Sequence, residues 1–209
     1  MHPRHLYLAG LLGLLPLACA ETPSDPTDPG VTVASDALPA AGAAYHGGSP
    51  HQFLGGDAQL FCGIHGNFTG AAAPPADLGT TVRSDYFATF QGELVLAPPL
   101  VATTETHVLS VQVHMVELIA LAGTQGTTRT FDTELVTFEL GGPTAPGGAQ
   151  VRESPSLASP GRTTITTLAD GRYRIESHYD VWLEISLDGG ATWHPAENMV
   201  RMTLGPPAS

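Results

Sequence analysis

Apolar and polar residues alternate along several stretches of the chain, with the period of two that is typical of a half-buried β-strand. Between residues 109 and 115 the apolar set consists of Leu109, Val111, Val113 and Met115. The phase then changes, and the following apolar set consists of Val116, Leu118 and Ala120. A β-bulge or a strand buried on both faces would explain the change.

The clearest alternation lies near the C-terminus, where residues 172–179 and 181–187 predict two half-buried strands. The predicted core face of the second strand consists of Val181, Leu183, Ile185 and Leu187. Asp170-Gly171 precedes the first strand, and residues 188–190 (Asp-Gly-Gly) follow the second. Such sequences supply the positive φ that tight hairpin turns require, so we expect turns at both places.

Further strands are predicted over residues 131–140, 151–154, 163–168 and 199–204, and no segment has the pattern of a long amphipathic helix. Eight or nine short strands joined by turns favour antiparallel sheets packed face to face. The sequence therefore predicts an all-β fold, an antiparallel β-sandwich that is immunoglobulin-like in general architecture. We expect it to form a single domain over residues 45–205.

The N-terminus has the pattern of an export signal, in which Arg4 precedes an apolar run over residues 6–17 and small residues follow. Cleavage after Ala20 would fit the small-x-small pattern, whereas cleavage before Cys19 would expose a thiol for lipid attachment and resembles a bacterial lipoprotein signal. Pro16 stands where the lipoprotein pattern usually has leucine. We assign residues 1–19 to the signal and expect residues 20–44, rich in Pro, Gly and Ala, to form a disordered tether.

Composition narrows the range of partners. The chain has 209 residues and a formal net charge of -12, and all eight of its basic Lys and Arg residues are arginine. This excess of negative charge repels phosphate backbones and argues against nucleic acid as a partner. The expected location is exported: an outer-membrane lipoprotein held by a lipid on Cys19, or a periplasmic or extracellular protein.

An ordered series of short motifs also resembles a known module. The motifs are Phe131-Asp-Thr-Glu134, Val151-Arg-Glu-Ser-Pro-Ser156, Gly161-Arg-Thr-Thr-Ile-Thr166 and the Asp180-Val-Trp-Leu-Glu-Ile-Ser-Leu-Asp-Gly-Gly-Ala-Thr-Trp193 stretch. Together they resemble a C-terminal module of uncharacterised exported bacterial proteins, notably from planctomycetes, over roughly residues 130–204. The resemblance implies a β-rich extracytoplasmic domain and no catalytic residues.

A candidate metal site lies in the glycine-rich segment before residue 70. Cys62 and His65 have a spacing that lets one loop present sulfur and imidazole to a single ion, and His46 and His51 are nearby in sequence. Thiolate and imidazole ligands suit copper or zinc. The alternatives are that Cys62 is a small core residue and that the histidines are ordinary surface residues.

A second candidate is a polar row on one strand face, consisting of Glu176, His178 and Asp180, with Trp182 in the same phase and Glu184 beyond it. Carboxylates bind calcium, and an aromatic ring beside carboxylates suits a sugar. The alternative is a solvated face of an antiparallel sheet.

The chain contains no Gly-x-Ser-x-Gly, Walker or His-Glu-x-x-His pattern. The sequence thus favours a non-catalytic envelope lipoprotein with a structural or binding role and an unidentified protein or glycan partner. The alternatives are a periplasmic copper- or zinc-binding protein and an enzyme with an unfamiliar site.

Overall fold

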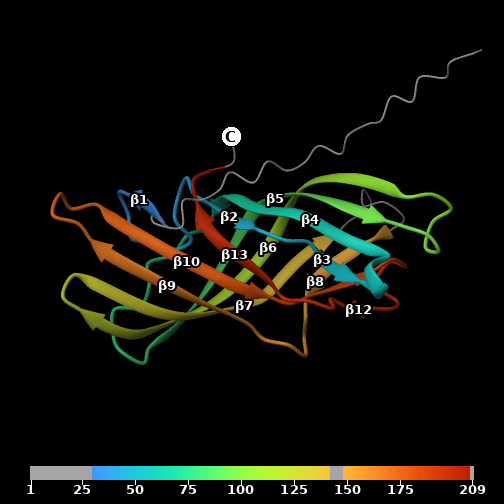
Figure 1. Cartoon of the computed structure of the whole chain (residues 1–209). Helices are drawn as coiled ribbons and strands as arrows, with labels where there is room; N and C mark the ends of the chain where they lie inside the picture. Colours follow the sequence, from blue (N-terminus) through green and yellow to red (C-terminus); the bar gives the residue numbers. More distant parts are fainter. Residues whose placement is uncertain (1–29, 142–147, 208–209) are drawn as a thin grey trace, which may run out of the picture.

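A computed structural model describes residues 30–141 and 148–207, apart from the side chain of Cys62. Within these residues the regular structure is mostly β-strand, with a turn of 3-10 helix, η1 (Leu54–Gly56), and a 3-10 conformation at Gly148. The strands, labelled in Figure 1, are β1 (Val31–Val33), β2 (Ala44–Gly47), β3 (His51–Phe53), β4 (Ala58–Thr69), β5 (Thr81–Leu96), β6 (Glu105–Gln125), β7 (Thr128–Gly141), β8 (Gln150–Glu153), β9 (Ser159–Thr167), β10 (Tyr173–Val181), β11 (Leu183–Ser186), β12 (His194–Pro195) and β13 (Val200–Gly205).

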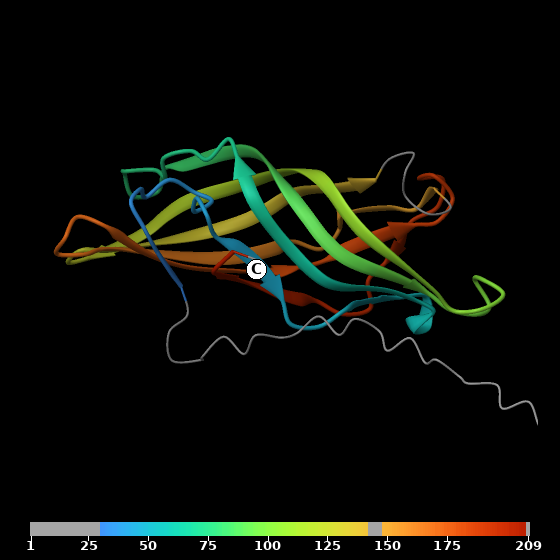
Figure 2. The same cartoon turned by 90° about the horizontal axis from the view of Figure 1, so that it is seen from above.

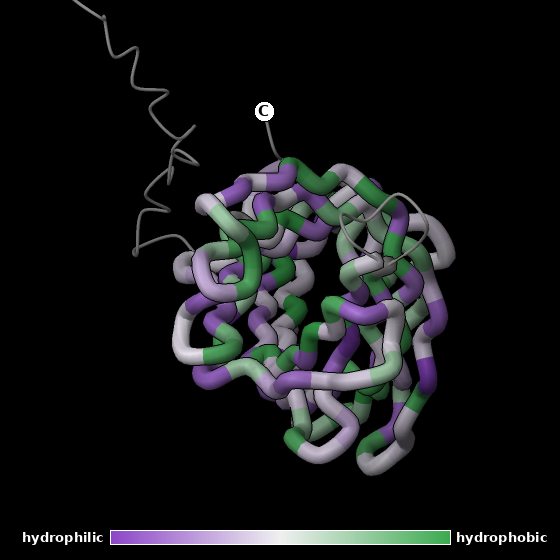
Figure 3. The backbone as a smooth tube through the Cα atoms, turned by 90° about the vertical axis from the view of Figure 1, so that its right-hand side faces the viewer, coloured by the Kyte–Doolittle hydropathy of each residue, from purple (hydrophilic) through white to green (hydrophobic). Residues whose placement is uncertain are grey.

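All strand pairs are antiparallel and belong to one 13-stranded sheet, which confirms the predicted all-β, antiparallel class. The expectation of two sheets packed face to face does not describe this sheet. Strand β9 pairs with both β7 and β10, so eight strands close into a barrel in the order β10-β13-β2-β4-β5-β6-β7-β9. Seen along its long axis, the backbone forms a ring (Figure 3). Strand twist and tilt allow long strands to close in this way.

The longest strands form one side of the wall. β5 and β6 pair over sixteen successive positions, from Thr81 with Ala120 to Leu96 with Glu105. In Figure 2 these two strands run diagonally across the molecule, in front of the strands from the C-terminal half. Alternate residues of β5 point inward and are buried, as the period of two requires.

The barrel has a seam at which one strand position is divided between two short strands. β9 lies between the first parts of β7 and β10, while β8 lies between the end of β7 and β11. Trp182 separates β10 from β11, and its backbone is bound on both sides: its N–H donates to Ser159 Oγ at 2.9 Å, and its carbonyl accepts from the Ser154 N–H at 2.9 Å. Side-chain and loop hydrogen bonds therefore replace the strand ladder at this point.

The predicted phase change in β6 is half correct. The pairing of β6 with β7 shifts between Val116 and Glu117, as a bulge would require. However, the inward row does not pass to Leu118 and Ala120, because Glu117, Ile119 and Leu121 continue it. Val116 is also fully buried, but it is not part of the main core cluster. The charged residue thus occupies a core position.

The ordered chain begins earlier than the predicted tether boundary at residue 44. β1 pairs with β10, and Leu38, Ala40 and Ala43 are buried in the core. The apolar side chains of this Gly- and Pro-rich segment therefore pack against the core and are removed from solvent. The signal region, Cys19 and the first part of the tether, residues 20–29, lie outside the described residues. No helix in the described ranges has the length and apolar character needed to cross a membrane.

Candidate functional site

Two of the four histidine and cysteine candidates line the same small cavity in the barrel wall. His51 on β3 and His65 on β4 both point inward and are buried, with 6 % of each residue exposed. They line a cavity of about 10 Å³, room for one water-sized sphere, together with Gly47, Gly63 and Met202 among others. Ser49, an exposed residue before β3, also lines the cavity, which therefore reaches the surface there.

Both imidazoles are held in an apolar environment. The His65 ring stacks on Phe138 at a centroid distance of 5.1 Å and meets the edge of Phe90 at 5.3 Å. Burial lowers the pKa of His65 to about 3 and that of His51 to about 4. The Nδ1 atom of His51 is buried and has no hydrogen-bond partner. At neutral pH both rings are uncharged, which is the form that binds metal.

Of the other two candidates, His46 does not join this pair, and the side chain of Cys62 is not described. His46 is on β2, and its Nε2 lies 2.8 Å from the carbonyl oxygen of Pro206 in an exposed hydrogen bond. Its neighbour Tyr45 is the residue of β2 that points inward beside His65. Cys62 lies within β4, and its side chain is outside the described structure. Among the described residues, no group of three or more His, Cys, Asp or Glu side chains is arranged to hold a metal.

The polar row on β10 faces outward as expected, but its carboxylates are paired with arginine. Arg174 Nε donates to Glu176 at 2.9 Å, and Arg201 binds Asp180 through two hydrogen bonds of 2.7 and 2.8 Å. The bond from Arg201 lowers the pKa of Asp180, and partial burial lowers that of His178. Carboxylates already neutralised in this way are poorer ligands for calcium, so the arrangement fits a solvated, ion-paired sheet face.

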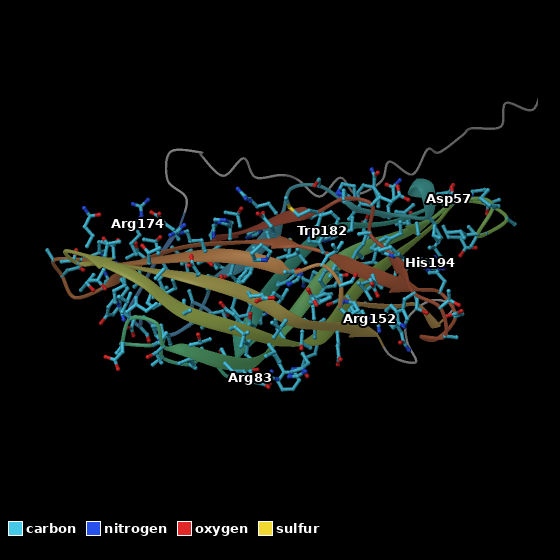
Figure 4. All side chains as sticks on the ribbon, turned by 90° about the horizontal axis from the view of Figure 1, so that it is seen from below. Asp57, Arg83, Arg152, Arg174, Trp182 and His194 are labelled. Carbon is cyan, nitrogen blue, oxygen red and sulfur yellow. The ribbon has the colours of Figure 1, made fainter. Side chains whose placement is uncertain are left out.

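Glu184 and Trp182 do not extend this row. Glu184 was expected on the solvent face, yet it is buried because β11 lies between β8 and β12, and all four of its residues are buried. Arg152 on β8 donates to Glu184 Oε2 at 3.0 and 2.7 Å, and the Trp193 ring lies 3.9 Å from the Arg152 guanidinium carbon. Figure 4 shows Trp182 between Arg174 toward one end of the molecule and Arg152 toward the other.

The four sequence motifs of the C-terminal half converge on the seam of the barrel. Arg152 from the second motif binds Glu184 from the fourth, as described above. Gly161 from the third motif lies so close to its neighbours that a Cβ there would be 2.6 Å from Thr133 Oγ1, in the first motif, and equally close to the Tyr179 ring. These residues hold the closure of the barrel together, so the motifs have a structural role here.

A polar cluster that the sequence analysis missed lies inside the barrel around Glu117. This carboxyl group is 2 % exposed and accepts a hydrogen bond from the Tyr179 hydroxyl. The Tyr45 hydroxyl donates to Ser177 Oγ at 2.8 Å, and the Tyr86 hydroxyl is buried without a partner. Burial raises the pKa of Glu117 to about 7. The signal in the sequence was the odd-numbered apolar row, which continues through position 117 to Ile119 and Leu121.

Comparison with known proteins adds no relative to these observations. No protein-family model, curated protein or solved structure matches this chain.

Proposed function

We propose that this protein is an exported, non-catalytic envelope lipoprotein, anchored to a membrane by a lipid on Cys19, with a barrel that has a structural or binding role. The observation that carries the proposal is the N-terminal pattern, an apolar run over residues 6–17 followed closely by Cys19. The polar, proline-rich segment from Glu21 to Gly30 would separate the lipid from the first strand, which begins at Val31. Ala20 after the cysteine favours the outer membrane by analogy with enteric sorting.

The interior of the barrel supports a binding role over turnover of an organic substrate. The cavity beside His51 and His65 has room for about one water molecule, and the carboxyl group of Glu117 lies in a packed core. Neither place admits a molecule of several atoms without movement of the wall. An enzyme with an unfamiliar site remains the third proposal, and a screen of hydrolase and transferase substrates tests it.

Lipid attachment is tested by the Cys19→Ser variant of the full chain. The parent protein should partition into the detergent phase and take up a labelled fatty acid, whereas Cys19→Ser should be soluble and unlabelled. Cys62→Ser is the matched control, since Cys62 is the only other cysteine, and it should behave as the parent does. Equal solubility of the parent and Cys19→Ser would contradict the anchor and leave a periplasmic or extracellular protein.

A second proposal, that the protein binds copper or zinc, is supported by the meeting of His51 and His65 at one cavity. Two neutral imidazoles are suitable ligands for either metal. His51→Gln and His65→Gln should each reduce the metal retained by purified protein, while His46→Gln, whose ring is hydrogen-bonded on the exposed side of β2, should not. Retention of less than about a tenth of an equivalent of either metal after loading would contradict the proposal.

A further inference from the structure

We infer that Met202 is a third ligand at the cavity of His51 and His65, and that the site prefers Cu(I) to Zn²⁺. The inference rests on the second proposal above, because it concerns the same cavity and names the ion. It adds a ligand that lies about 140 residues further along the chain than the two histidines.

The geometry comes from three strands that meet at the cavity. Met202 is on β13, points inward in the apolar row between Val200 and Leu204, and is 4 % exposed. β13 pairs with β2, and Met202 is the partner of Gly47 in that pairing. The thioether is therefore placed beside the cavity by the strand register.

Two glycines keep the space between the ligands open. A Cβ at Gly47 would lie 2.8 Å from the sulfur of Met202, so a side chain there would displace the thioether. A Cβ at Gly63 would lie 3.7 Å from the Met202 methyl carbon and 3.7 Å from His65 Nε2. A Cβ at Gly63 would thus contact both the methionine and the histidine.

The unpartnered Nδ1 of His51 is the second observation that points to a ligand. A buried nitrogen without a hydrogen-bond partner costs about 1–3 kcal/mol unless something binds it. His51 is 6 % exposed and lines the same cavity. A metal ion or a water molecule there would complete its coordination.

The chemistry of the lining selects a soft ion of low charge. A thioether is a soft ligand that favours Cu(I), and imidazole is compatible with it. None of the described residues that line the cavity is a carboxylate. Two imidazoles and a thioether leave the full charge of the metal uncompensated, and a single buried charge costs less than a double one. Zn²⁺ would gain nothing from the thioether and would keep both of its charges.

The test compares Cu(I) and Zn²⁺ affinities in the full chain carrying Cys19→Ser and Cys62→Ser, so that neither thiol competes. Cu(I) is titrated under anaerobic conditions against bicinchoninate, and Zn²⁺ is titrated against a chromophoric chelator. Met202→Leu, a substitution of similar volume, should lower the affinity for Cu(I) at least about tenfold and leave the affinity for Zn²⁺ almost unchanged. Met115→Leu is the matched control, because Met115 is equally buried but does not line the cavity.

A second variant keeps every ligand and fills the space. The added methyl group of Gly63→Ala would make ordinary contacts of 3.4 to 3.7 Å, so the variant should fold and yet lose Cu(I). X-ray absorption of the copper-loaded Cys62→Ser protein should show a sulfur neighbour that Met202→Leu removes. Thermal denaturation without metal verifies that each variant is folded.

The outcomes separate this inference from the proposal on which it rests. If neither metal binds, the second proposal fails and a water molecule occupies the cavity. If metal binds through His51 and His65 but Met202→Leu leaves Cu(I) affinity unchanged, only the assignment of Met202 is overturned. Binding of Cu(I) by the parent that disappears in Cys62→Ser would overturn it as well.

Discussion

Replacing Glu117 by glutamine should make the stability of the barrel less sensitive to pH. Glu117 lies in the core of a closed barrel, where the side chains facing it come from β2, β5 and β10: Tyr45, Tyr86 and Tyr179. All three are uncharged at neutral pH, since their pKa values are raised by burial. None of them compensates a carboxylate charge, so the proton on Glu117 is retained to a higher pH than in water.

The magnitude follows from the pKa of Glu117, which burial raises from its ordinary value of 4.5 to about 7. Between these two values the folded protein holds a proton that the unfolded chain has released. Stability therefore falls as the pH rises through this interval, by about 1.4 kcal/mol per pH unit and about 3 kcal/mol in all. The stabilisation is complete below pH 4.5 and has been lost above pH 7.

Other groups titrate in the same interval and hide this effect in the parent protein alone. The pKa values of His51 and His65 are lowered, so these residues cost stability as the pH falls below 6.5. Glu153, partly buried beside Ser159, has a raised pKa and acts in the same direction as Glu117. These contributions cancel in the difference between a variant and the parent, so the difference in unfolding free energy is the quantity to measure.

The measurement is urea denaturation of Glu117→Gln and the parent at pH 5 and pH 8. Glutamine keeps an acceptor for the Tyr179 hydroxyl and cannot ionise. Relative to the parent, the variant should gain about 2.5 kcal/mol between pH 5 and pH 8. Glu139→Gln, on an exposed position of β7, removes the same charge outside the barrel and is the control. If the difference in unfolding free energy between Glu117→Gln and the parent were the same at pH 5 and pH 8, the conclusion that Glu117 is buried without a compensating charge would be refuted.

Three further substitutions test the seam and the wall. Gly161→Ala should lower the free energy of unfolding by about 1–3 kcal/mol or more, because the new methyl group would overlap Thr133 and Tyr179. The methyl group of the control Gly123→Ala meets no atom within 4 Å. If guanidinium denaturation gave equal costs for both variants, the close approach of β9 would be contradicted. Ile185→Ala should cost about 2–5 kcal/mol in the same assay. Glu184→Ala should cost less, since its partner Arg152 keeps part of its side chain in water, and the reverse order would show that this ion pair is the main support of β11.

The strand faces could be predicted from the sequence because alternation is a local property. Val181, Leu183 and Ile185 are buried as predicted, and Gly189 and Gly190 have φ values of 74° and 93° in the expected turn. Alternation identifies the face that a residue occupies but not the strand beside it. The closure through β9 depends on pairing with β7 and β10, and neither partner leaves a local mark in the sequence.

The candidate site could also be predicted only in part from the sequence. The spacing of Cys62 and His65 indicated a metal site with His46 or His51 nearby, but Met202 comes from the last strand. Only the register of β13 on β2 places it beside the cavity. The predicted phase change placed Val116, Leu118 and Ala120 on the core face and thus left Glu117 off it. Its burial follows from the barrel, whose inward face continues through every second residue of β6, whatever its charge.

The distribution of charge connects the acidic composition with the proposed cavity. Each arginine in the described ranges lies within ion-pair distance of a carboxylate, so these cations neutralise carboxylates locally and create no basic patch of their own. Among the other carboxylates in the described ranges, five are exposed to solvent, and the whole chain has a formal net charge of -12. A negative exterior raises the local concentration of cations at any opening in the wall and repels polyanions. The cavity beside Ser49 opens into this field, while its lining is neutral. Cations would thus be attracted to the opening in general, and the thioether of Met202 with the two imidazoles would select among them.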